Sequence, residues 1–280
     1  MRVTFNGVRG SVPTPGPTTV RYGGNTSCVD VKLADGTLVV LDAGTGIRAL
    51  GERLMQEGVP DVIHLLVTHV HWDHIIGAPF FKPLWIPGKK VNIYTFSPDA
   101  FQRMDNPVIF DGVHFPVRFS AIPATIDTVH VQEAEIRIGS ARIRRIPLNH
   151  PGGSDGFRID DEGGASLCFL TDNEIRPPGQ SRTTSADLAR FAEGAGMVVH
   201  DAQYVPADMP MKAGWGHSLV EDALALGRDA EARTIALYHH EPERSDDALD
   251  AIASEANEWR DANAPAMKVV VTKEGETFDL

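Results

Sequence analysis

Thr68-His69-Val70-His71-Trp72-Asp73-His74 is the stretch of this sequence that decides the fold. It follows the apolar run 62–67, whose length and branched residues predict a buried strand. A turn at the end of a strand can direct three imidazoles and one carboxylate toward a common point, and these groups suit Zn²⁺, Mn²⁺ or iron. The spacing predicts that His69 and His71 converge on one ion while Asp73 and His74 turn toward a second. The alternative is a histidine-rich surface loop without metal.

Four later apolar runs end in the same way. They are 143–148, followed by Asn149-His150; 167–170, followed by Thr171-Asp172; 197–199, followed by His200-Asp201; and 235–238, followed by His239-His240. A single histidine after a strand is usually an ordinary loop residue. Five strand ends that share the pattern indicate one site, because loops at strand ends present side chains on a rigid frame.

Most of the histidines belong to this pattern. Of the 11, seven lie in these turns or in Gly216-His217-Ser218, namely those at positions 69, 71, 74, 150, 200, 217 and 239. The other four, His64, His114, His130 and His240, lack this support, although His240 could contact the ligands. The role of His200 stays open.

The order of the predicted elements indicates the fold class. Short strands separated by turns fill the first 60 residues around one helix near 42–56, and a helix is expected over 76–85. Later strands alternate with helices at 185–193, 218–227 and 246–262, which predicts an α/β (α+β) four-layer arrangement of two sheets between helices. We find no repeat or clear linker, so residues 1–280 are predicted to form a single domain. The aromatic, aperiodic segment 100–123 is predicted to be a lid or dimer-contact segment.

Composition limits the partners. With 26 Lys and Arg against 38 Asp and Glu, the formal net charge is −12, and the basic residues are scattered. A long nucleic acid, which is gripped through many phosphate contacts, is therefore disfavoured, whereas a local pocket could hold a small anion. No stretch resembles a membrane span or a signal peptide, and Cys28 and Cys168 do not suggest a disulfide framework. We expect a cytoplasmic protein.

The H-x-H-x-D-H turn, followed in order by His150, Asp172 and His239, resembles the metallo-β-lactamase superfamily. More narrowly, the motifs at 200–202, 216–218 and 237–239 resemble the C-terminal motifs of its tRNase Z-like phosphodiesterase branch. The resemblance covers nearly the whole chain and implies an αββα sandwich with a two-metal site at one edge of the sheets. It implies one ion on His69, His71 and His150, another on Asp73, His74 and His239, and Asp172 as the bridge. Zn²⁺ is the expected ion, with Mn²⁺ as the alternative.

The same resemblance implies a hydrolytic mechanism. Two divalent cations lower the pKa of a bridging water and neutralise charge that develops on phosphorus. His217, oriented by Asp201, is expected to serve the leaving oxygen, and Asp73 is counted with them as catalytic. The tRNase Z family typically has Glu where this chain has Asp201. Asp42 is expected either to orient ligands or to cap the following helix, and Ser218 to cap the helix after it. Tyr204 and Trp215 could stack on a base or pack internally.

These features predict a dinuclear-metal-dependent phosphodiesterase that uses a metal-bridging hydroxide on a small phosphodiester, such as a cyclic nucleotide or a cyclic ribose phosphate. A homodimer, common in the branch, is expected. One alternative is a tRNA 3′-end processing endonuclease, which the net charge of −12 and the lack of a basic, Gly-rich arm disfavour. The others are a metal-holding small-molecule carrier and a lactone or thioester hydrolase. The His217–Asp201 pair favours a phosphodiesterase over both, because a carrier has no leaving group to protonate and the hydrolysis of a lactone or thioester needs no such pair.

Overall fold

The computed structural model describes residues 1–97, 100, 103 and 108–280. Their strands form two seven-stranded mixed sheets. The first has the order β14-β1-β2-β3-β4-β5-β6, from β1 (Arg2–Gly7), β2 (Cys28–Lys32), β3 (Leu38–Leu41), β4 (Val62–Leu66), β5 (Lys90–Thr95), β6 (Thr125–His130) and β14 (Thr277–Asp279). The second has the order β13-β12-β11-β10-β9-β8-β7, from β7 (Glu135–Ile138), β8 (Ala141–Leu148), β9 (Ser154–Asp161), β10 (Ser166–Leu170), β11 (Met197–Asp201), β12 (Thr234–Tyr238) and β13 (Lys268–Val271).

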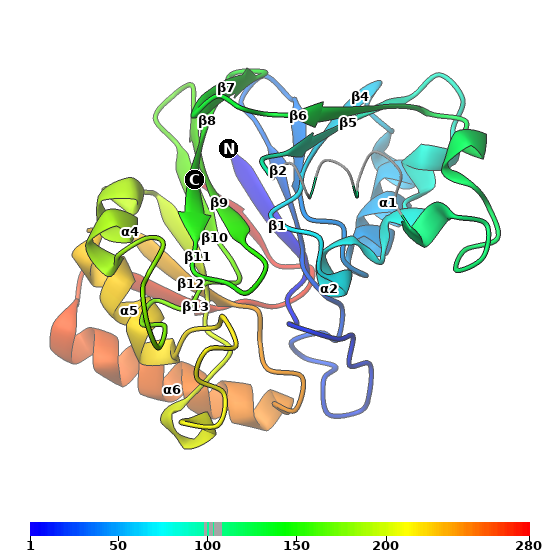
Figure 1. The fold of residues 1–280 in the computed structure, drawn as a ribbon. Coiled ribbons are helices and arrows are strands. Elements are labelled where there is room, and N and C mark those ends of the chain that lie inside the picture. Colours follow the sequence, from blue (N-terminus) through cyan, green and yellow to red (C-terminus); the bar gives the residue numbers. More distant parts are fainter. Residues whose placement is uncertain (98–99, 101–102, 104–107) are drawn as a thin grey trace.

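Helices cover the outer face of each sheet, on opposite sides of the molecule (Figure 1). Helix α1 (Ile47–Glu57) packs on the first sheet, whereas α4 (Ser185–Ala192), α5 (Val220–Asp229) and α6 (Asp246–Asn263) pack on the second. The central core between the sheets takes apolar side chains from both, including Phe5 and Val31 from one and Phe157 and Tyr238 from the other. The predicted four-layer αββα class is therefore confirmed. None of the helices that the structure describes combines the length and apolar character needed for a membrane span.

Parallel pairing brings several strand ends to one edge. Strands β10, β11, β12 and β13 run parallel in the second sheet, and β3, β4, β5 and β6 do so in the first. The carboxyl ends of parallel strands meet at the same edge of a sheet, where α/β proteins place their ligands. Asp172, Asp201 and His239 follow or end β10, β11 and β12, and His69 follows β4.

The region after the H-x-H-x-D-H turn differs from the expectation of one helix over 76–85. The chain instead forms α2 (Trp72–Ile75) and two 3-10 turns, Ala78–Phe80 and Lys82–Trp85. Pro79 and Pro83 lie in the first turn of these short helices, where a missing N–H is tolerated. Each proline therefore starts a new turn and prevents one continuous helix.

The predicted lid or dimer-contact segment, 100–123, is only partly described, because residues 101–102 and 104–107 lie outside the described residues. The described remainder contains the 3-10 turns Val108–Phe110 and Phe119–Ala121. Phe115 makes edge contacts with Phe80 and Phe110, with ring centroids 5.8 and 5.7 Å apart. This part of the segment thus packs beside the 3-10 turns that follow α2, and its predicted role stays a prediction.

Candidate metal centre

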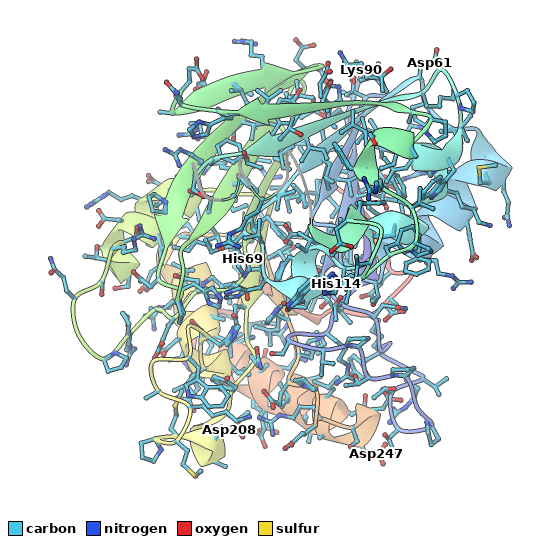
Figure 2. All side chains as sticks on the ribbon, turned by 45° about the vertical axis from the view of Figure 1, so that its right-hand side comes forward. Asp61, His69, Lys90, His114, Asp208 and Asp247 are labelled. Atoms are coloured by element: carbon cyan, nitrogen blue, oxygen red, sulfur yellow. The ribbon has the colours of Figure 1, made fainter. Side chains whose placement is uncertain are left out.

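The H-x-H-x-D-H turn connects a strand of the first sheet to a short helix. Strand β4 ends at Leu66, and His71 is the N-cap of α2, so Asp73 and His74 lie within the helix while His69 lies before it. The change from strand to helix turns the four side chains toward two points, as the sequence predicted. His69, Asp73 and His74 are buried, whereas His71 is exposed. Figure 2 shows His69 near the middle of the molecule, between Asp61 and Lys90 at one end and Asp208 and Asp247 at the other.

The first group of candidate ligands joins His69 and His71 to His150 and Asp172. His69 Nε2 and His150 Nε2 each lie 3.6 Å from Asp172 Oδ2. His150 Nε2 lies 3.0 Å from His71 Nδ1. Ligands about 2.1 Å from a tetrahedral ion would be about 3.4 Å apart, so these separations suit one ion.

The second group lies on the other side of Asp172. Asp172 Oδ1 is 3.1 Å from His74 Nε2 and 3.2 Å from His239 Nε2. Asp73 Oδ2 is 3.2 Å from each of the same two nitrogen atoms. Asp172 thus directs one carboxylate oxygen toward each group, which is the geometry expected of a bridging ligand. All seven side chains predicted to hold metal lie together in these two groups.

The chemistry of His74 tests whether cations fit here. Its Nδ1 lies 2.7 Å from Asp42 Oδ2 and donates to it, which leaves the Nε2 lone pair facing the carboxylate oxygens of Asp73 and Asp172. The Nε2 atoms of both His69 and His74 are buried and make no hydrogen bond. Lone pairs on nitrogen and oxygen repel one another at these distances unless a proton or a cation lies between them. The donor set therefore fits divalent cations.

The pKa values support the same conclusion. Burial lowers the pKa of His69 well below its usual value and that of His150 to about 4, so both imidazoles are neutral donors near pH 7. Burial also disfavours a charged His74, but Asp172, Asp73 and Asp42 outweigh it and raise its pKa well above the usual value. Although burial would raise the pKa of Asp172, His239, His74 and His69 hold it well below its usual range. Without metal, the carboxylates therefore attract a proton to the place where a cation would lie.

Asp42 supports this region from behind the ligands. Its Oδ1 accepts hydrogen bonds from the backbone N–H of Thr68 at 2.8 Å and from Thr68 Oγ1 at 3.0 Å, and its Oδ2 binds His74. Helix α1 has Gly46 as its N-cap, with no side-chain hydrogen bond. The helix-capping alternative for Asp42 is therefore wrong. Its contacts are those of a residue that orients ligands, because a bonded Nδ1 fixes the ring and the tautomer of His74.

Other partners orient the remaining histidines. His150 Nδ1 donates to the carbonyl of Gly216 at 3.0 Å, and His239 Nδ1 donates to Gln203 Oε1 at 3.0 Å. In each case Nε2 is left facing the other ligands. Sequence reasoning missed Gln203, which carries no signal beyond its position two residues after a strand end.

Backbone strain is concentrated at the site. Among the described non-glycine residues, five have positive φ, and three of these are Asp42 (62°), Asp172 (54°) and His239 (61°). A fourth, Ser11 (62°), donates its N–H to Asp73 Oδ2 at 2.8 Å. Such conformations cost about 1–3 kcal/mol each and persist where the surrounding structure determines them, commonly at functional sites.

His217 and Asp201 form the predicted pair. His217 Nδ1 lies 2.5 Å from Asp201 Oδ2, and the His217 ring stacks on His239 with centroids 5.0 Å apart. Burial disfavours the imidazolium, but Asp201 outweighs it and raises the pKa of His217 to about 9. The aspartate, one methylene shorter than the glutamate typical of the tRNase Z family, therefore still reaches His217. Because Nδ1 is bonded to Asp201, Nε2 is the atom left to exchange a proton with a ligand.

Several secondary expectations are settled by the contacts. Ser218 does not cap α5, whose N-cap is Leu219; its Oγ donates to the Asn173 carbonyl at 2.5 Å and accepts from Ile175 N. Tyr204 is buried against His217, so it packs internally, whereas Trp215 is 59% exposed. His240 bonds to the carbonyl of Thr272 and not to a ligand. His200 lies behind the site and contacts Asn173.

A cavity of about 710 Å³ opens beside the first group of ligands. His69 and His71 lie on one side of it, and Arg145, Arg182, the turn Gly152-Gly153 and the residues directly after β5 line the rest. A volume of this size accommodates a nucleotide-sized ligand. The exposed His71 marks the place where such a ligand would reach the ions.

Residues 37–240 match the family described as the Beta-lactamase superfamily domain. The chain belongs to this superfamily. The matched range contains every candidate metal ligand, from His69 to His239. Membership confirms the superfamily that the H-x-H-x-D-H turn indicated, and proteins of this fold bind divalent metals.

Similar proteins include a curated ribonuclease Z from Haloarcula marismortui, 26% identical over 284 residues that cover 85% of this chain and 86% of the relative. Among solved structures, a diphosphatase from the PhnP family has a TM-score of 0.66 and 19% identity, over 100% of this chain and 97% of that one. The short form of human tRNase Z also has a TM-score of 0.66, with 17% identity over 100% and 99% of the two chains.

These similarities support the tRNase Z-like branch of the β-lactamase superfamily and identify the chain as a metal-dependent hydrolase, as the sequence predicted. They do not favour a small phosphodiester over tRNA as the substrate. The curated relatives are named for an RNA-processing activity, which conflicts with the expectation that no long nucleic acid is bound.

Proposed function

We propose that this β-lactamase superfamily member is a phosphodiesterase that uses two divalent cations. His69, His71 and His150 would hold one ion, Asp73, His74 and His239 the other, and Asp172 would bind both. The observation that carries the proposal is that the two carboxylate oxygens of Asp172 face different ligand groups at 3.1–3.6 Å. The His217–Asp201 pair lies beside them. We propose Zn²⁺ as the native ion, with Mn²⁺ as the alternative.

When bound, the cations supply Lewis acidity, which activates water near neutral pH and offsets the negative charge of a phosphodiester. The protein supplies the rest. His217 Nε2 donates a proton to the leaving oxygen, while the Asp201 carboxylate stabilises the imidazolium and fixes the ring through Nδ1. Asp42 and Gln203 hold His74 and His239 in the orientation that directs their Nε2 atoms inward.

We propose a small phosphodiester as the substrate, such as a cyclic nucleotide or a cyclic ribose phosphate. The net charge of −12 and a cavity of about 710 Å³ support it. The second candidate is tRNA 3′-end processing, which the names of the curated relatives favour. We also propose a cytoplasmic homodimer. A carrier would leave the His217–Asp201 pair without a leaving group to protonate, which disfavours that alternative.

The test is an assay of the metal-depleted protein, reloaded with Zn²⁺ or Mn²⁺, against cyclic nucleotides, linear dinucleotides, bis(p-nitrophenyl) phosphate and tRNA precursors. The proposal expects metal-dependent cleavage that chelation abolishes. Affinity for a small substrate should depend weakly on salt, whereas affinity for tRNA should fall steeply with salt. A fully loaded protein that cleaves no phosphodiester would overturn the function, and steep salt dependence with preferred tRNA cleavage would overturn the choice of substrate.

A further inference from the structure

The cavity beside His69 and His71 is cationic in a protein of net charge −12. Among the described residues that line it, Arg103, Arg145 and Arg182 are basic and Asp155 is acidic. Arginine side chains in this cavity add positive charge to that of the candidate metal ions. Together they offer more positive charge than one phosphodiester group requires. The question is which of the arginines is available to a ligand.

Arg145, on β8, is held in place by neighbours. Its Nη1 donates to the Phe96 carbonyl at 3.0 Å and to Asp155 Oδ1 at 3.2 Å, and its guanidinium lies 5.8 Å from the centre of the Phe96 ring. Asp155 is buried and neutralises much of the Arg145 charge. Arg145 therefore forms a fixed wall of the cavity with limited capacity for another anion.

Arg182 differs, because no carboxylate within the described ranges lies at ion-pair distance from its guanidinium. Its backbone is fixed by Asn149, the residue before the candidate ligand His150: Asn149 Oδ1 accepts from the N–H groups of Arg182 at 2.8 Å and Thr183 at 3.1 Å. The exposed side chain extends over Gly153, where a Cβ would lie 2.8 Å from Arg182 Nη1. The glycine, with φ of 90°, leaves the space that the guanidinium occupies.

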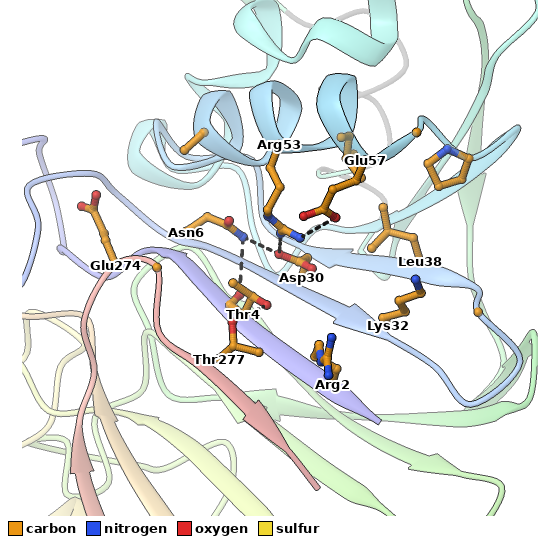
Figure 3. Close-up of a pocket in the computed structure, with 16 residues that line it drawn as sticks. Arg2, Thr4, Asn6, Asp30, Lys32, Leu38, Arg53, Glu57, Glu274 and Thr277 are labelled. Atoms are coloured by element: carbon orange, nitrogen blue, oxygen red, sulfur yellow. Dashed lines mark hydrogen bonds and ion pairs between the residues drawn. The ribbon is translucent and has the colours of Figure 1, made fainter.

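A second cavity shows the contrast. It measures about 570 Å³ and lies on the outer side of the first sheet, beside α1 (Figure 3). Its arginines are paired, Arg53 with Asp30 and Glu57, and Arg2 with Asp279. Each of these guanidinium groups already forms an ion pair with a carboxylate, so this cavity attracts an anion less than the one that contains Arg182.

We propose that Arg182 binds a second phosphate of the substrate, so that the natural substrate carries a terminal phosphate in addition to the scissile phosphodiester. This inference rests on the proposed function, because the same cavity joins the candidate ions to the arginine. A guanidinium presents a planar fork of donors that matches two oxygens of a phosphate, and its fixed backbone reduces the entropy lost on binding. Charged hydrogen bonds of this kind correspond to about a 10- to 100-fold gain in affinity.

The experiment compares two ligands that differ by one phosphate, thymidine 5′-phosphate and thymidine 3′,5′-bisphosphate, by calorimetry on the metal-loaded protein. The bisphosphate should bind about 10- to 100-fold more tightly. Arg182→Gln should reduce this ratio to a few-fold. The matched control is Arg137→Gln, which removes the same charge from an exposed arginine on β7, away from the cavity, and should leave the ratio unchanged.

Equal affinity for the two ligands in the unmodified protein would overturn the inference, as would a ratio that survives Arg182→Gln. An oligonucleotide extended at the 3′ phosphate that binds more than tenfold tighter than the bisphosphate would also overturn it, and would assign the cavity to a nucleic-acid chain. Because the measurement is binding and not turnover, it separates this inference from the proposed function. An Arg182-dependent ratio in a protein that cleaves no phosphodiester would contradict the function alone.

Discussion

Asp172 follows β10 and lies between the two ligand groups, with Oδ1 facing His74 and His239 and Oδ2 facing His69 and His150. The residue pattern alone shows only an aspartate after an apolar run, and the bridging position of Asp172 was expected from the family resemblance. The side chain's direction depends on a backbone φ of 54° and on pairing between β10 and its neighbours. The sequence predicted the candidate ligands from strand ends and from the family resemblance, whereas the distances between them depend on the packing of two sheets.

Asp172→Asn should reduce bound metal from two ions to one or none per chain, because the amide retains the shape and loses the charge that both ligand groups share. Metal content after dialysis, measured by atomic emission, checks this. Asp30→Asn is the control: Asp30 is also buried and is paired with Arg53, so its loss should lower stability while two ions remain. Two ions in Asp172→Asn would show that the bridge is assigned wrongly.

His217→Ala should retain both ions and lose turnover according to the leaving group. We expect a loss of about 10²- to 10⁴-fold for an alkoxide, which needs a proton, and a much smaller loss for p-nitrophenolate, which does not. The measurement is kcat for two esters that share one phosphate and differ in the leaving alcohol. Equal losses for both would contradict a proton donor at this position.

The pH dependence follows from the pKa of His217, which Asp201 raises to about 9 against the opposing effect of burial. The imidazolium is present below its pKa and is lost as the pH rises through it. Bound cations would move that pKa downward from about 9, because positive charge disfavours imidazolium. We expect kcat for an alkoxide ester to fall about tenfold per pH unit above this point. The pH–rate profile of His217→Ala should lack this fall in kcat at high pH. If the fall persists in the variant, another group causes it.

At the scale of elements, the strands with clear apolar runs were predicted and three were missed. Strand β6 has a half-exposed alternation, Thr125–His130, and β9, Ser154–Asp161, contains three aspartates and an arginine. Strand β14, Thr277–Asp279, is short and lies at a sheet edge beside β1. These segments form strands because neighbouring strands supply hydrogen-bonding partners, which local composition does not reveal.

The loop before α5 provides an element-scale prediction. Gly214 and Gly216 have similar φ, 83° and 90°, and each donates its N–H to Glu174. A Cβ at Gly216 would lie 2.2 Å from His150 Nδ1, whereas one at Gly214 meets Pro178 at 3.3 Å. Both alanine variants should lose about 1–2 kcal/mol of stability from the left-handed conformation.

Gly216→Ala should in addition displace His150 and lower the affinity for the ion that His150 would hold together with His69 and His71. Thermal unfolding and metal content, measured on both variants, separate the two effects. Gly214→Ala serves as the matched control and should retain two ions. Loss of metal from both variants would mean that loop strain alone, and not the contact with His150, disturbs the site.

At the scale of the whole molecule, the two cysteines report on different layers. Cys28 lies in the apolar core beneath α1 and Cys168 in the core beneath α4, α5 and α6, and both thiols are free and buried. Burial raises the pKa of Cys168 to about 12 and that of Cys28 well above its usual value, so neither thiol is reactive at pH 8 in the folded protein.

If residues 1–280 form a single domain, as predicted, the two thiols should become reactive at the same denaturant concentration. Alkylation with iodoacetamide across a denaturant titration, with each cysteine followed by mass spectrometry, should give one common midpoint. The fully unfolded protein, in which both should label, is the control. Midpoints that differ between Cys28 and Cys168 would show that the two halves of the sandwich unfold separately.

The distribution of the candidate ligands over both sheets has a consequence for the order of biosynthesis. The H-x-H-x-D-H turn belongs to the first sheet and leaves the ribosome early, whereas His150, Asp172 and His239 follow strands of the second sheet and are made later. The nascent chain therefore presents an incomplete set of donors through most of its synthesis. The ligands of one candidate ion are complete once Asp172 has been translated, whereas the other ion also needs His239, which follows β12. Acquisition of both cations would therefore be a late event that marks a nearly finished fold.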